Sequence, residues 1–264
     1  MIDEVSQVST QMWHRLAPLT KLTQVICMGN PEDQLLAVAD GWLDQPLAKD
    51  VSDSLLLRSI CGYRRLRLTE GRRSCGELFS IYSSFSTQGW RSALGLPYMI
   101  SYARARLPPR GYADVNLVIS HKARRKHIDG WIAARQPEAE TLTIGSDGGS
   151  HQIRIWKGTV LTAVLDSLSK HGIYNAQLLE VLGWGPETLA LQCCEGGETY
   201  SVPRSWAEHN LRHGSCITYA AIQARTCHGT VQLLDWSSRR FTRRHLVMGL
   251  SRATSVEKVW MGEA

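Results

Sequence analysis

The stretches YAAIQARTCHGTVQLLD (219–235) and RRHLVMGLSRATSVEKVW (243–260) decide the fold. Each joins an apolar run, typical of a buried strand or helix, to a short polar segment that contains glycine. In an α/β sheet, such polar segments follow the buried elements and carry the contacts to ligands. In the second stretch Ser251 and Arg252 directly follow a predicted helix face formed by Leu246, Val247, Met248 and Leu250. We therefore expect Arg252 to be held rigidly.

Composition sets broad limits on the class of protein. The chain has 264 residues, of which 43% are hydrophobic, so it can bury a substantial core. Its formal net charge of +6 and its pI of about 9.0 are compatible with a polyanionic partner and equally with an ordinary solvated basic surface. Seven cysteines, an odd number without a C-x-x-C pair, indicate reduced thiols and thus an intracellular compartment, cytosol or nucleus.

Neither a membrane segment nor a metal-binding motif is indicated. The N-terminus MIDEVSQVS lacks the basic and then apolar pattern of a signal peptide, and no apolar run approaches the length of a membrane span, so we expect a soluble protein with no membrane partner. The spacing His209-x-x-x-His213-x-x-Cys216 has no credible fourth ligand, and we interpret it as a polar loop.

The two C-terminal stretches resemble the last two signature motifs of superfamily 1 DNA helicases, in the 5′-3′ branch that includes the RecD-like enzymes. Residues 221–230 match the family's A-x-T-x-H-K-x-Q-G-x-T segment at Ala221 and Gly229, and His228 stands where the family prefers glutamine. The resemblance implies that this segment contacts single-stranded DNA, through Arg225, His228, Gly229 and Thr230. Residues 247–253 resemble V-A-L-S-R-A, which implies that Arg252 is an arginine finger for the γ-phosphate of ATP.

Two N-terminal segments extend the resemblance. Asp3-Glu4-Val5-Ser6 resembles the Asp-Glu-x-Ser motif, in which Asp3 would hold Mg²⁺ and Glu4 would activate the attacking water. Without the family, two such acids would be interpreted as a cap for the following helix. Residues 29–35 resemble G-D-x-x-Q-L, so Gln34 would sense the γ-phosphate. Asn30 replaces the family's aspartate and one residue is inserted, and an ordinary turn is the alternative.

The middle of the chain supplies two further candidate sites. Residues 66–74 resemble L-x-x-x-Y-R-S, whose arginine contacts terminal phosphates, and by alignment this arginine is Arg73. A surface basic cluster is the alternative interpretation. Residues 115–121 form the clearest core strand, which ends in Ser120 and His121. In the family a strand at this place is followed by a helix whose basic residues face DNA, so both residues are candidates for nucleic-acid binding.

A change in the sequence pattern at 151–208 predicts a separate module. Five short β-rich runs alternate with glycine turns, at 153–156, 159–164, 177–182, 188–193 and 199–202. They predict a small β-barrel inserted into an α/β, RecA-like parallel-sheet helicase core, with Trp156 and Trp184 in its core or rim. The predicted layout is a C-terminal remnant of the first RecA-like domain at 1–60, a second RecA-like domain at 61–150 and 209–264, and the barrel at 151–208.

The phosphate loop of such a motor is missing from the sequence. None of the 264 residues forms a G-x-x-x-x-G-K-S/T run, whose amides and lysine hold the β- and γ-phosphates. Since the Asp-Glu motif begins at Asp3, the loop would have preceded Met1, and we expect a truncated start. The resemblance implies ATP and Mg²⁺ as cofactors, but this stretch alone is expected to bind ATP weakly and to hydrolyse little.

Three interpretations follow from the sequence. The first is the C-terminal portion of an ATP-dependent DNA helicase or translocase that acts on single-stranded DNA or DNA junctions. The second is a non-catalytic nucleic-acid-binding module derived from a helicase, which the missing phosphate loop, Asn30 and His228 favour. The third is a basic α/β protein of unrelated function, which five motif matches in the family's order disfavour.

Overall fold

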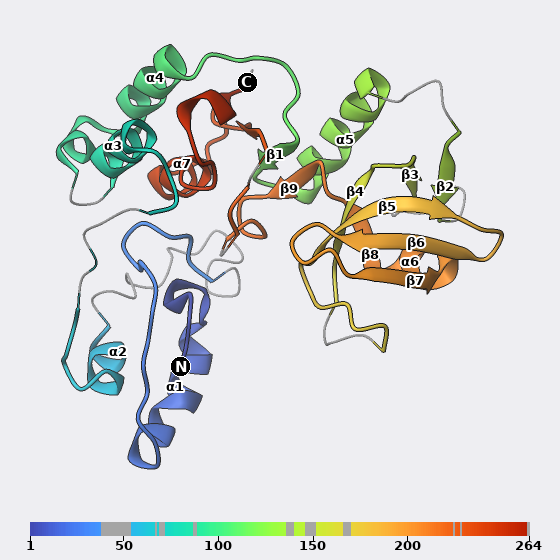
Figure 1. Ribbon diagram of the computed structural model, residues 1–264. Coiled ribbons are helices and arrows are strands. Elements are labelled where there is room, and N and C mark those ends of the chain that lie inside the picture. The colour runs from blue at the N-terminus through green and yellow to red at the C-terminus, as the bar shows by residue number, and fades with distance from the viewer. Residues whose placement is uncertain are drawn as a thin grey trace. The chain divides into compact units, whose positions relative to one another are not determined.

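The structure, a computed structural model, describes residues 1–37, 54–66, 68, 72–86, 89–135, 140–145, 152–165, 170–223, 225–227 and 229–262 (Figure 1). The chain forms two compact units. Unit 1 consists of Met1–Ala113 and Ile222–Ala264, and unit 2 of Asp114–Ala221. No helix in these described ranges is both long enough and apolar enough to cross a membrane.

Short helices form the N-terminal part of unit 1. They are the 3₁₀ helices η1 (Val5–Gln7) and η2 (Ala17–Lys21) and the α-helices α1 (Thr10–Leu16) and α2 (Leu55–Ile60). Ser9 caps α1 by accepting a hydrogen bond from the amide of Met12 at 3.3 Å, and Ser54 caps α2 in the same way. Val5, Trp13 and Ile60 form the buried core of this part.

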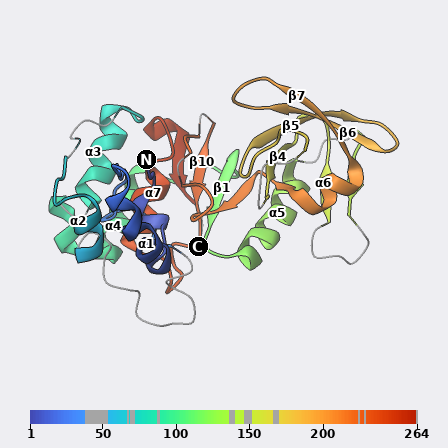
Figure 2. The ribbon, with the colours of Figure 1, turned by 90° about the horizontal axis from the view of Figure 1, so that it is seen from below.

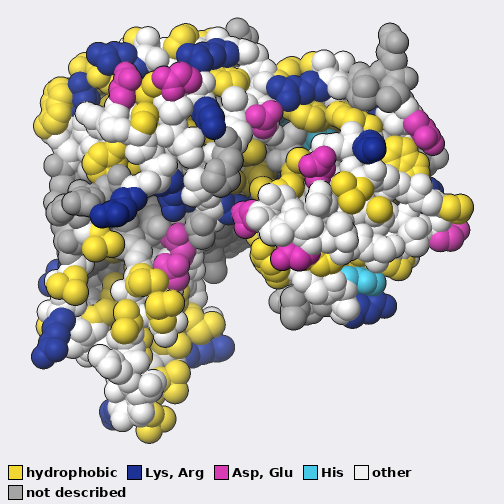
Figure 3. Space-filling model, viewed as in Figure 1, with side chains coloured by type: hydrophobic (Ala, Val, Ile, Leu, Met, Phe, Trp, Pro, Cys, Tyr) yellow, Lys and Arg dark blue, Asp and Glu magenta, His cyan; other side chains and the backbone are white. Residues whose placement is uncertain are grey.

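The apolar segment before Gly29 forms a single parallel bridge and not a strand. Ile2 pairs with Cys27, and the amides of Ile2 and Met28 donate to the carbonyls of Ile26 and Ile2 at 2.7 and 2.8 Å. Large apolar side chains around this bridge are exposed, including Leu22 at 83% and Ile26 at 54%. Figure 3 shows hydrophobic side chains in yellow over α1 and α2. The missing strand length follows from this exposure, because parallel strands are stable when both of their faces are covered.

The remainder of unit 1 is built on apolar helix faces and a parallel strand pair. It contains α3 (Gly76–Phe85), η5 (Trp90–Leu94), α4 (Leu96–Arg106), β10 (Val231–Leu233), α7 (Arg243–Leu250), η6 (Val256–Lys258) and β11 (Val259–Met261). In β10 and β11, Val231, Gln232 and Leu233 pair with Val259, Trp260 and Met261. Helices α3, α4 and α7 lie together in both views (Figures 1 and 2). The predicted α7 face is confirmed, since Leu246, Val247, Met248 and Leu250 are buried.

Arg243, in the first turn of α7, connects the C-terminal segment of unit 1 to its N-terminal segment. Its guanidinium forms an ion pair with Asp33, whose side chain is only 8% exposed, and donates to the carbonyls of Glu32 at 3.0 Å and Phe85 at 3.3 Å. The neighbouring Arg244 donates to the carbonyl of Gln34 at 2.9 Å. The turn at 32–34 is therefore fastened to α7.

Unit 2 begins with one parallel strand pair and its helix. Strand β1 (Val115–Val118) pairs in parallel with β9 (Cys216–Thr218), with Asn116, Leu117 and Val118 opposite Cys216, Ile217 and Thr218. Between them in the chain, α5 (His121–Arg135) follows β1 directly. The buried side-chain amide of Asn116 donates from Nδ2 to the carbonyl of Ser215 at 2.7 Å, so this polar residue fixes the register inside the core.

An antiparallel sheet forms the rest of unit 2. Its strand order is β7-β6-β5-β4-β8, from β4 (Val160–Ala163), β5 (Leu178–Trp184), β6 (Thr188–Cys193), β7 (Thr199–Pro203) and β8 (Leu211–His213). Helix α6 (Arg204–Asn210) connects β7 to β8, and β2 (Leu142–Ile144) pairs with β3 (Ile153–Ile155) in a separate two-stranded sheet. Figure 2 shows the long hairpins of the larger sheet from a second side.

The strand composition of this sheet corrects one expectation. Four of the five predicted runs form β4 to β7, but the run at 153–156 does not join them and pairs with β2 instead. The fifth strand is β8, which lies in the segment 209–216 that we interpreted from the sequence as a polar loop. This interpretation was wrong because His213 is buried, 3% exposed, and packs among aromatic side chains.

Two aromatic side chains, Trp131 and Trp156, cover the buried ring of His213. The indoles of Trp131 and Trp156 stack with their ring centres 5.6 Å apart, and the His213 ring meets Trp131 edge-on at 5.0 Å. The hydroxyl of Ser215 lies 2.7 Å from Nδ1 of His213. Burial lowers the pKa of His213 from its usual 6.5 to about 4, because a charged imidazole would lose its hydration here.

We expect Arg243→Ala to lower the free energy of unfolding by about 3 kcal/mol, since it leaves the Asp33 carboxylate buried without its cation. Denaturant unfolding followed by circular dichroism measures this loss. The double variant R243A/D33A should regain part of it, and Arg239→Ala, at an exposed position, should change little. Equal losses in the single and double variants would contradict the proposed role of the ion pair.

His213 should make stability depend on pH in a defined window. Above pH 6.5 the imidazole is neutral in both the folded and the unfolded state, so it has no effect on stability. As the pH falls from 6.5 towards about 4, only the unfolded state takes up the proton, and the folded state loses about 3 kcal/mol in total. The loss levels off below pH 4. Subtracting the unfolding curves of His213→Phe from those of the parent chain isolates this slope, and a flat difference would contradict it.

Candidate functional site

Asp3 and Glu4 lie at the start of unit 1 in a fixed local geometry. The amide of Glu4 donates to Oδ1 of Asp3 at 2.8 Å. Glu4 has a φ of 52°, in the left-handed region that a non-glycine residue occupies only when its surroundings impose it. The bridge of Ile2 before it and the bond from the amide of Val5 to the carbonyl of Met28, at 3.0 Å, supply that constraint. The Glu4 carboxylate is half-buried, whereas Asp3 is exposed.

Gln34 contacts Glu4 directly. Its Nε2 donates to the Glu4 carboxylate, and its Oε1 accepts from the amide of Asn30 at 2.8 Å and from the hydroxyl of Ser6 at 3.3 Å. The three contacts leave the amide group one orientation, with its donor towards the carboxylate. Gly29 makes this turn possible, because its φ is 139° and a Cβ atom there would lie 2.9 Å from the backbone nitrogen of Val5.

Arg252 is buried at the end of α7. Its side chain donates to the carbonyl of Met248 at 3.2 Å, the carbonyl of Arg225 at 2.9 Å and the hydroxyl of Ser251 at 3.0 Å. Only 5% of the residue is exposed. The expectation that Arg252 is held rigidly is therefore confirmed, and all three of these bonds go to uncharged oxygen atoms.

Arg73 reaches the same place from the segment before α3. The hydroxyl of Ser74 donates to the carbonyl of Ala253 at 2.8 Å, and the amide of Cys75 donates to the carbonyl of Thr254 at 2.8 Å. These bonds place the exposed side chain of Arg73 in the surroundings of Arg252. The two residues that follow Arg73 are thus hydrogen-bonded to the two residues that follow Arg252.

The electrostatics show that the charged groups act on one another. Burial raises the pKa of Glu4, the charge of Asp3 raises it further, and the guanidinium groups of Arg252 and Arg73 oppose the shift. Burial and the neighbouring Arg73 lower the pKa of Arg252 to about 10, against the attraction of Glu4. One half-buried carboxylate therefore lies within the electrostatic influence of two guanidinium groups, an arrangement suited to an anionic ligand and a water molecule that must lose a proton.

The segment at 223–230 contacts this group in two places, at Arg252 and at Gln7, which lies close to Glu4 in the chain. The amide of Cys227 donates to the carbonyl of Arg252 at 2.8 Å, and Gln7 donates from Nε2 to Gln223 at 2.6 Å and to the carbonyl of Leu35 at 2.7 Å. Among the candidate nucleic-acid contacts, Arg225 and Thr230 are half-buried and Gly229 is exposed. His228 lies outside the described residues.

Ser120 and His121 belong to unit 2 and not to this group. The Ser120 hydroxyl accepts from the amide of Ala123 at 3.2 Å, so it caps α5. His121 is exposed at the first position of α5, and its pKa is lowered by partial burial and then by the charges of Arg124 and Arg125. The structure thus brings together the five residues expected around the nucleotide, while the candidate DNA contacts are divided between the two units.

Several residues that organise the site were not singled out from the sequence. They are Ser6 and Gln7, which orient Gln34 and Gln223, and Arg243 and Arg244, which hold the turn at 32–34. The sequence did carry a signal for the two arginines. Two adjacent guanidinium groups at the start of an apolar helix gain nothing from the helix dipole, which indicates that they have another role. Their partners lie about two hundred positions away and could not be read from the pattern.

The donor set at the acids suits Mg²⁺ coordinated largely by water and phosphate. Among the described residues, no group of three or more histidine, cysteine, aspartate or glutamate side chains gathers to enclose a metal ion. Mg²⁺ is commonly held by one or two carboxylates, with waters and phosphates completing its coordination. Asp3 is exposed and only one of its oxygens is engaged by Glu4, so it fits that role.

A cavity of about 440 Å³ opens beside these acids, within unit 1. Its lining includes Val5, which follows Glu4, and Gly29, together with Arg58, Arg64 and Arg65. Arg65 is paired with Glu32 at 2.8 Å.

Comparison with solved structures identifies the fold. Three of the similar structures are described as two coordinating Pif1 helicases unwinding forked double-stranded DNA, Pif1 helicase from Bacteroides in complex with ADP-AlF3 and single-stranded DNA, and Pif1 helicase from Candida albicans. Their TM-scores are 0.67, 0.65 and 0.62, at 15%, 15% and 12% sequence identity. The matches cover 99%, 99% and 100% of this chain and 68%, 70% and 72% of those chains.

Sequence comparison adds nothing further, since no family model and no curated protein sequence matches. The structural matches nevertheless extend over almost the whole chain, including the motifs at both of its ends. The chain therefore has the α/β fold of a RecA-like helicase core.

Proposed function

We propose that this chain is part of an ATP-dependent DNA helicase or translocase, in the RecD-like 5′-3′ branch of superfamily 1. It would couple ATP hydrolysis to movement on single-stranded DNA and to duplex unwinding. One observation carries the proposal: Arg252 lies within electrostatic reach of Glu4 and is hydrogen-bonded to Arg225 at 2.9 Å. The charged residues around Glu4, which are suited to phosphate chemistry, are thus joined through Arg252 to the segment that resembles a DNA-binding motif. The complex of a Pif1 helicase with ADP-AlF3 and single-stranded DNA supports it.

Each residue of the group has a proposed task. Asp3 would hold Mg²⁺, which supplies charge neutralisation at the phosphates when it is bound. Glu4 would accept a proton from the attacking water, for which a pKa raised by burial is favourable. Gln34 would orient Glu4 and respond to the γ-phosphate, and Arg73 and Arg252 would stabilise negative charge on the transferred group.

Coupling between the two ligands would pass through Arg252. Its Nη1 is bonded to the carbonyl of Arg225, so a guanidinium that turns towards a phosphate must release this carbonyl. The released carbonyl belongs to the segment that would present Arg225, His228, Gly229 and Thr230 to a DNA strand. Binding at one site would therefore change the backbone at the other, which is the requirement for reciprocal linkage.

The proposed layout follows the motifs. Residues 1–60 would be the C-terminal portion of a first RecA-like domain, 61–150 and 209–264 a second one, and 151–208 a small barrel insertion. Because no phosphate loop occurs within the 264 residues, we infer that the working motor takes this loop from sequence outside them. On their own these residues would bind ATP weakly.

A non-catalytic nucleic-acid-binding module is the second candidate. It is favoured by the three hydrogen bonds of Arg252, which already engage each of its three side-chain nitrogens with protein oxygens. In this alternative the chain binds single-stranded DNA, and Glu4 and Gln34 are remnants that stabilise the fold. Turnover of ATP separates the two candidates.

We expect Glu4→Gln to lower DNA-stimulated ATP hydrolysis about 100- to 10,000-fold, because it removes the proton acceptor while keeping the contact to Gln34. The measurement is phosphate release in the presence of oligo(dT), with the protein encoded by the complete natural transcript. Glu77→Gln, an exposed residue in the first turn of α3, is the matched control. Equal turnover by E4Q and the parent protein would eliminate the proposed base, and absence of turnover in the parent with retained DNA binding would favour the second candidate.

We expect Thr230→Val to weaken binding of single-stranded DNA about tenfold, since a hydroxyl that donates to a phosphate contributes roughly 1.5 kcal/mol. Fluorescence anisotropy of a labelled oligo(dT) at fixed salt measures the affinity, and both candidate functions predict the loss. Thr199→Val, on the exposed edge of β7, serves as the control and should bind like the parent. An unchanged affinity for T230V would remove the segment at 225–230 from the DNA-binding surface.

A further inference from the structure

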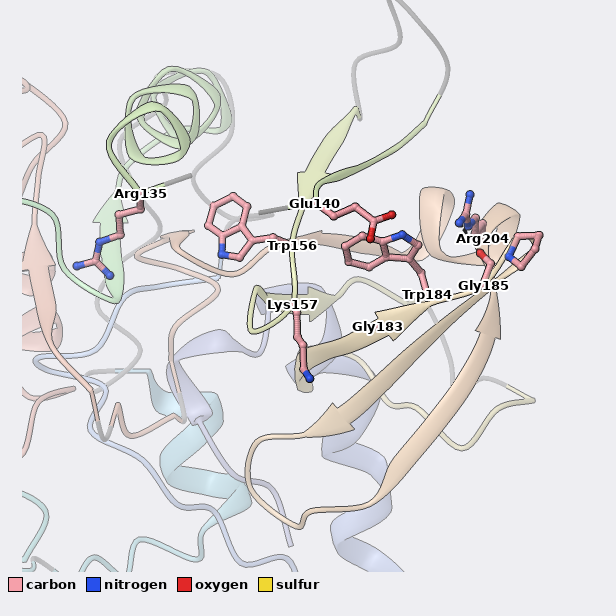
Figure 4. Close-up of a pocket in the computed structure, with 9 residues that line it drawn as sticks. Arg135, Glu140, Trp156, Lys157, Gly183, Trp184, Gly185 and Arg204 are labelled. Atoms are coloured by element: carbon pink, nitrogen blue, oxygen red, sulfur yellow. Dashed lines mark hydrogen bonds between the residues drawn. The ribbon is translucent and has the colours of Figure 1, made fainter. Parts of the chain in front are cut away.

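A second cavity lies wholly within unit 2, and none of the candidate site residues lines it. Its volume is about 840 Å³, within the range of small-molecule sites. Two indoles line it, Trp156 and Trp184, together with Arg135, Lys157, Arg204 and Glu140. Figure 4 shows Arg135 at one end and Arg204 at the other, with both indoles between them.

The wall that carries Trp184 is built by a β-bulge. The register between β5 and β6 shifts between Val181 and Gly183, after which Trp184 pairs with Leu189. A bulge of this kind twists a strand and redirects the side chains that follow it. The hairpin beyond is fixed, because the amide of Gly185 donates to the carbonyl of Thr188 at 3.0 Å and the Arg204 guanidinium donates to the carbonyl of Gly185.

Trp156 forms the opposite wall and is equally fixed. Its indole stacks on Trp131 with an interplanar angle of 13°, and it also lies 6.3 Å from the ring of His213. Trp184 packs against the core of the sheet and is only partly covered. Both indoles are thus supported on one side by protein and are held in place before any ligand arrives, so little entropy would be lost on binding.

Gly183 leaves space between these walls. A Cβ atom built on it would meet no other atom within 4 Å, and its φ lies outside the left-handed region. Backbone geometry therefore does not require glycine here. The open volume beside Trp184 depends on the absence of a side chain at this position.

The charge at the rim favours an anion. Among the described residues that line the cavity, three are cations and one, Glu140, is a carboxylate. Arg135 also pairs with Asp114 at 3.3 Å, at an exposed site where such a pair contributes little, and Lys157 is exposed. Their positive charge is therefore available to a phosphate that approaches from solvent.

We propose that this cavity binds one unstacked nucleotide of a single-stranded nucleic acid. The base would lie against the indoles of Trp156 and Trp184, in the space left by Gly183, and the flanking phosphates would contact Lys157 and Arg135. Stacking on aromatic side chains combined with cations along the backbone is the way proteins bind single strands without regard to sequence. An acidic peptide would match the cations, but its carboxylates would leave both indole faces unused.

The test uses the full chain and an oligo(dT) containing 5-iodouracil, which crosslinks to aromatic residues on irradiation. Mass spectrometry should locate the adduct on Trp184 or Trp156. Gly183→Leu should fill the cavity, abolish this adduct and weaken binding about tenfold, the usual effect of losing one stacked base. Gly76→Leu is the matched control, because a Cβ atom there also meets nothing within 4 Å and its φ is likewise ordinary.

A second variant keeps the proposal testable if G183L folds poorly. Lys157→Gln, at an exposed position, should reduce the slope of log affinity against log salt by about one phosphate contact. Adducts at other residues only, with unchanged binding by G183L and K157Q, would overturn the proposal. So would a poly-glutamate peptide that occupies the cavity when oligo(dT) does not. The readout needs no ATP hydrolysis, so loss of the motor function and loss of this site are separate results.

Discussion

The buried guanidinium of Arg252 is the constraint on which unit 1 depends. A charge placed at 5% exposure is costly unless it is hydrogen-bonded, and three oxygens of the protein accept hydrogen bonds from this guanidinium. One of them belongs to Arg225, which lies 27 residues earlier, so the loop at 225–227 must close against the end of α7. The backbone of this loop is held by this bond, by the bond from the amide of Cys227 to the carbonyl of Arg252, and by the burial of Cys227.

Helix α7 sets the distance between the two parts of the site. It has eight residues and is therefore about 12 Å long. Its first turn holds the turn at 32–34, and its last turn leads to Arg252. The contact of Gln34 with Glu4 and the charges around Glu4 thus depend on the same helix, although they come from opposite ends of the sequence.

Local patterns predicted the elements better than their partners. The apolar face of α7 and the rigidity of Arg252 could be predicted, because packing one face of a helix follows from side-chain periodicity. The proximity of Gln34 to Glu4 is consistent with the motif resemblance. The pairing of β3 with β2 and the place of β8 in the larger sheet could not be predicted, since strands of three residues carry little periodic signal and their register depends on distant neighbours. The burial of His213 was also missed, because its sequence neighbours are polar.

The bond between Arg243 and Asp33 spans 210 positions of the chain and bears on biosynthesis. A ribosome that adds about 5 to 20 residues per second needs roughly 10 to 40 s to bring the second partner out after the first. During that interval the turn at 32–34 lacks its anchor, and the apolar side chains of the N-terminal helices face the solvent. The order of synthesis therefore leaves this turn and the helices beside it without their partner in α7 until the C-terminal residues have emerged.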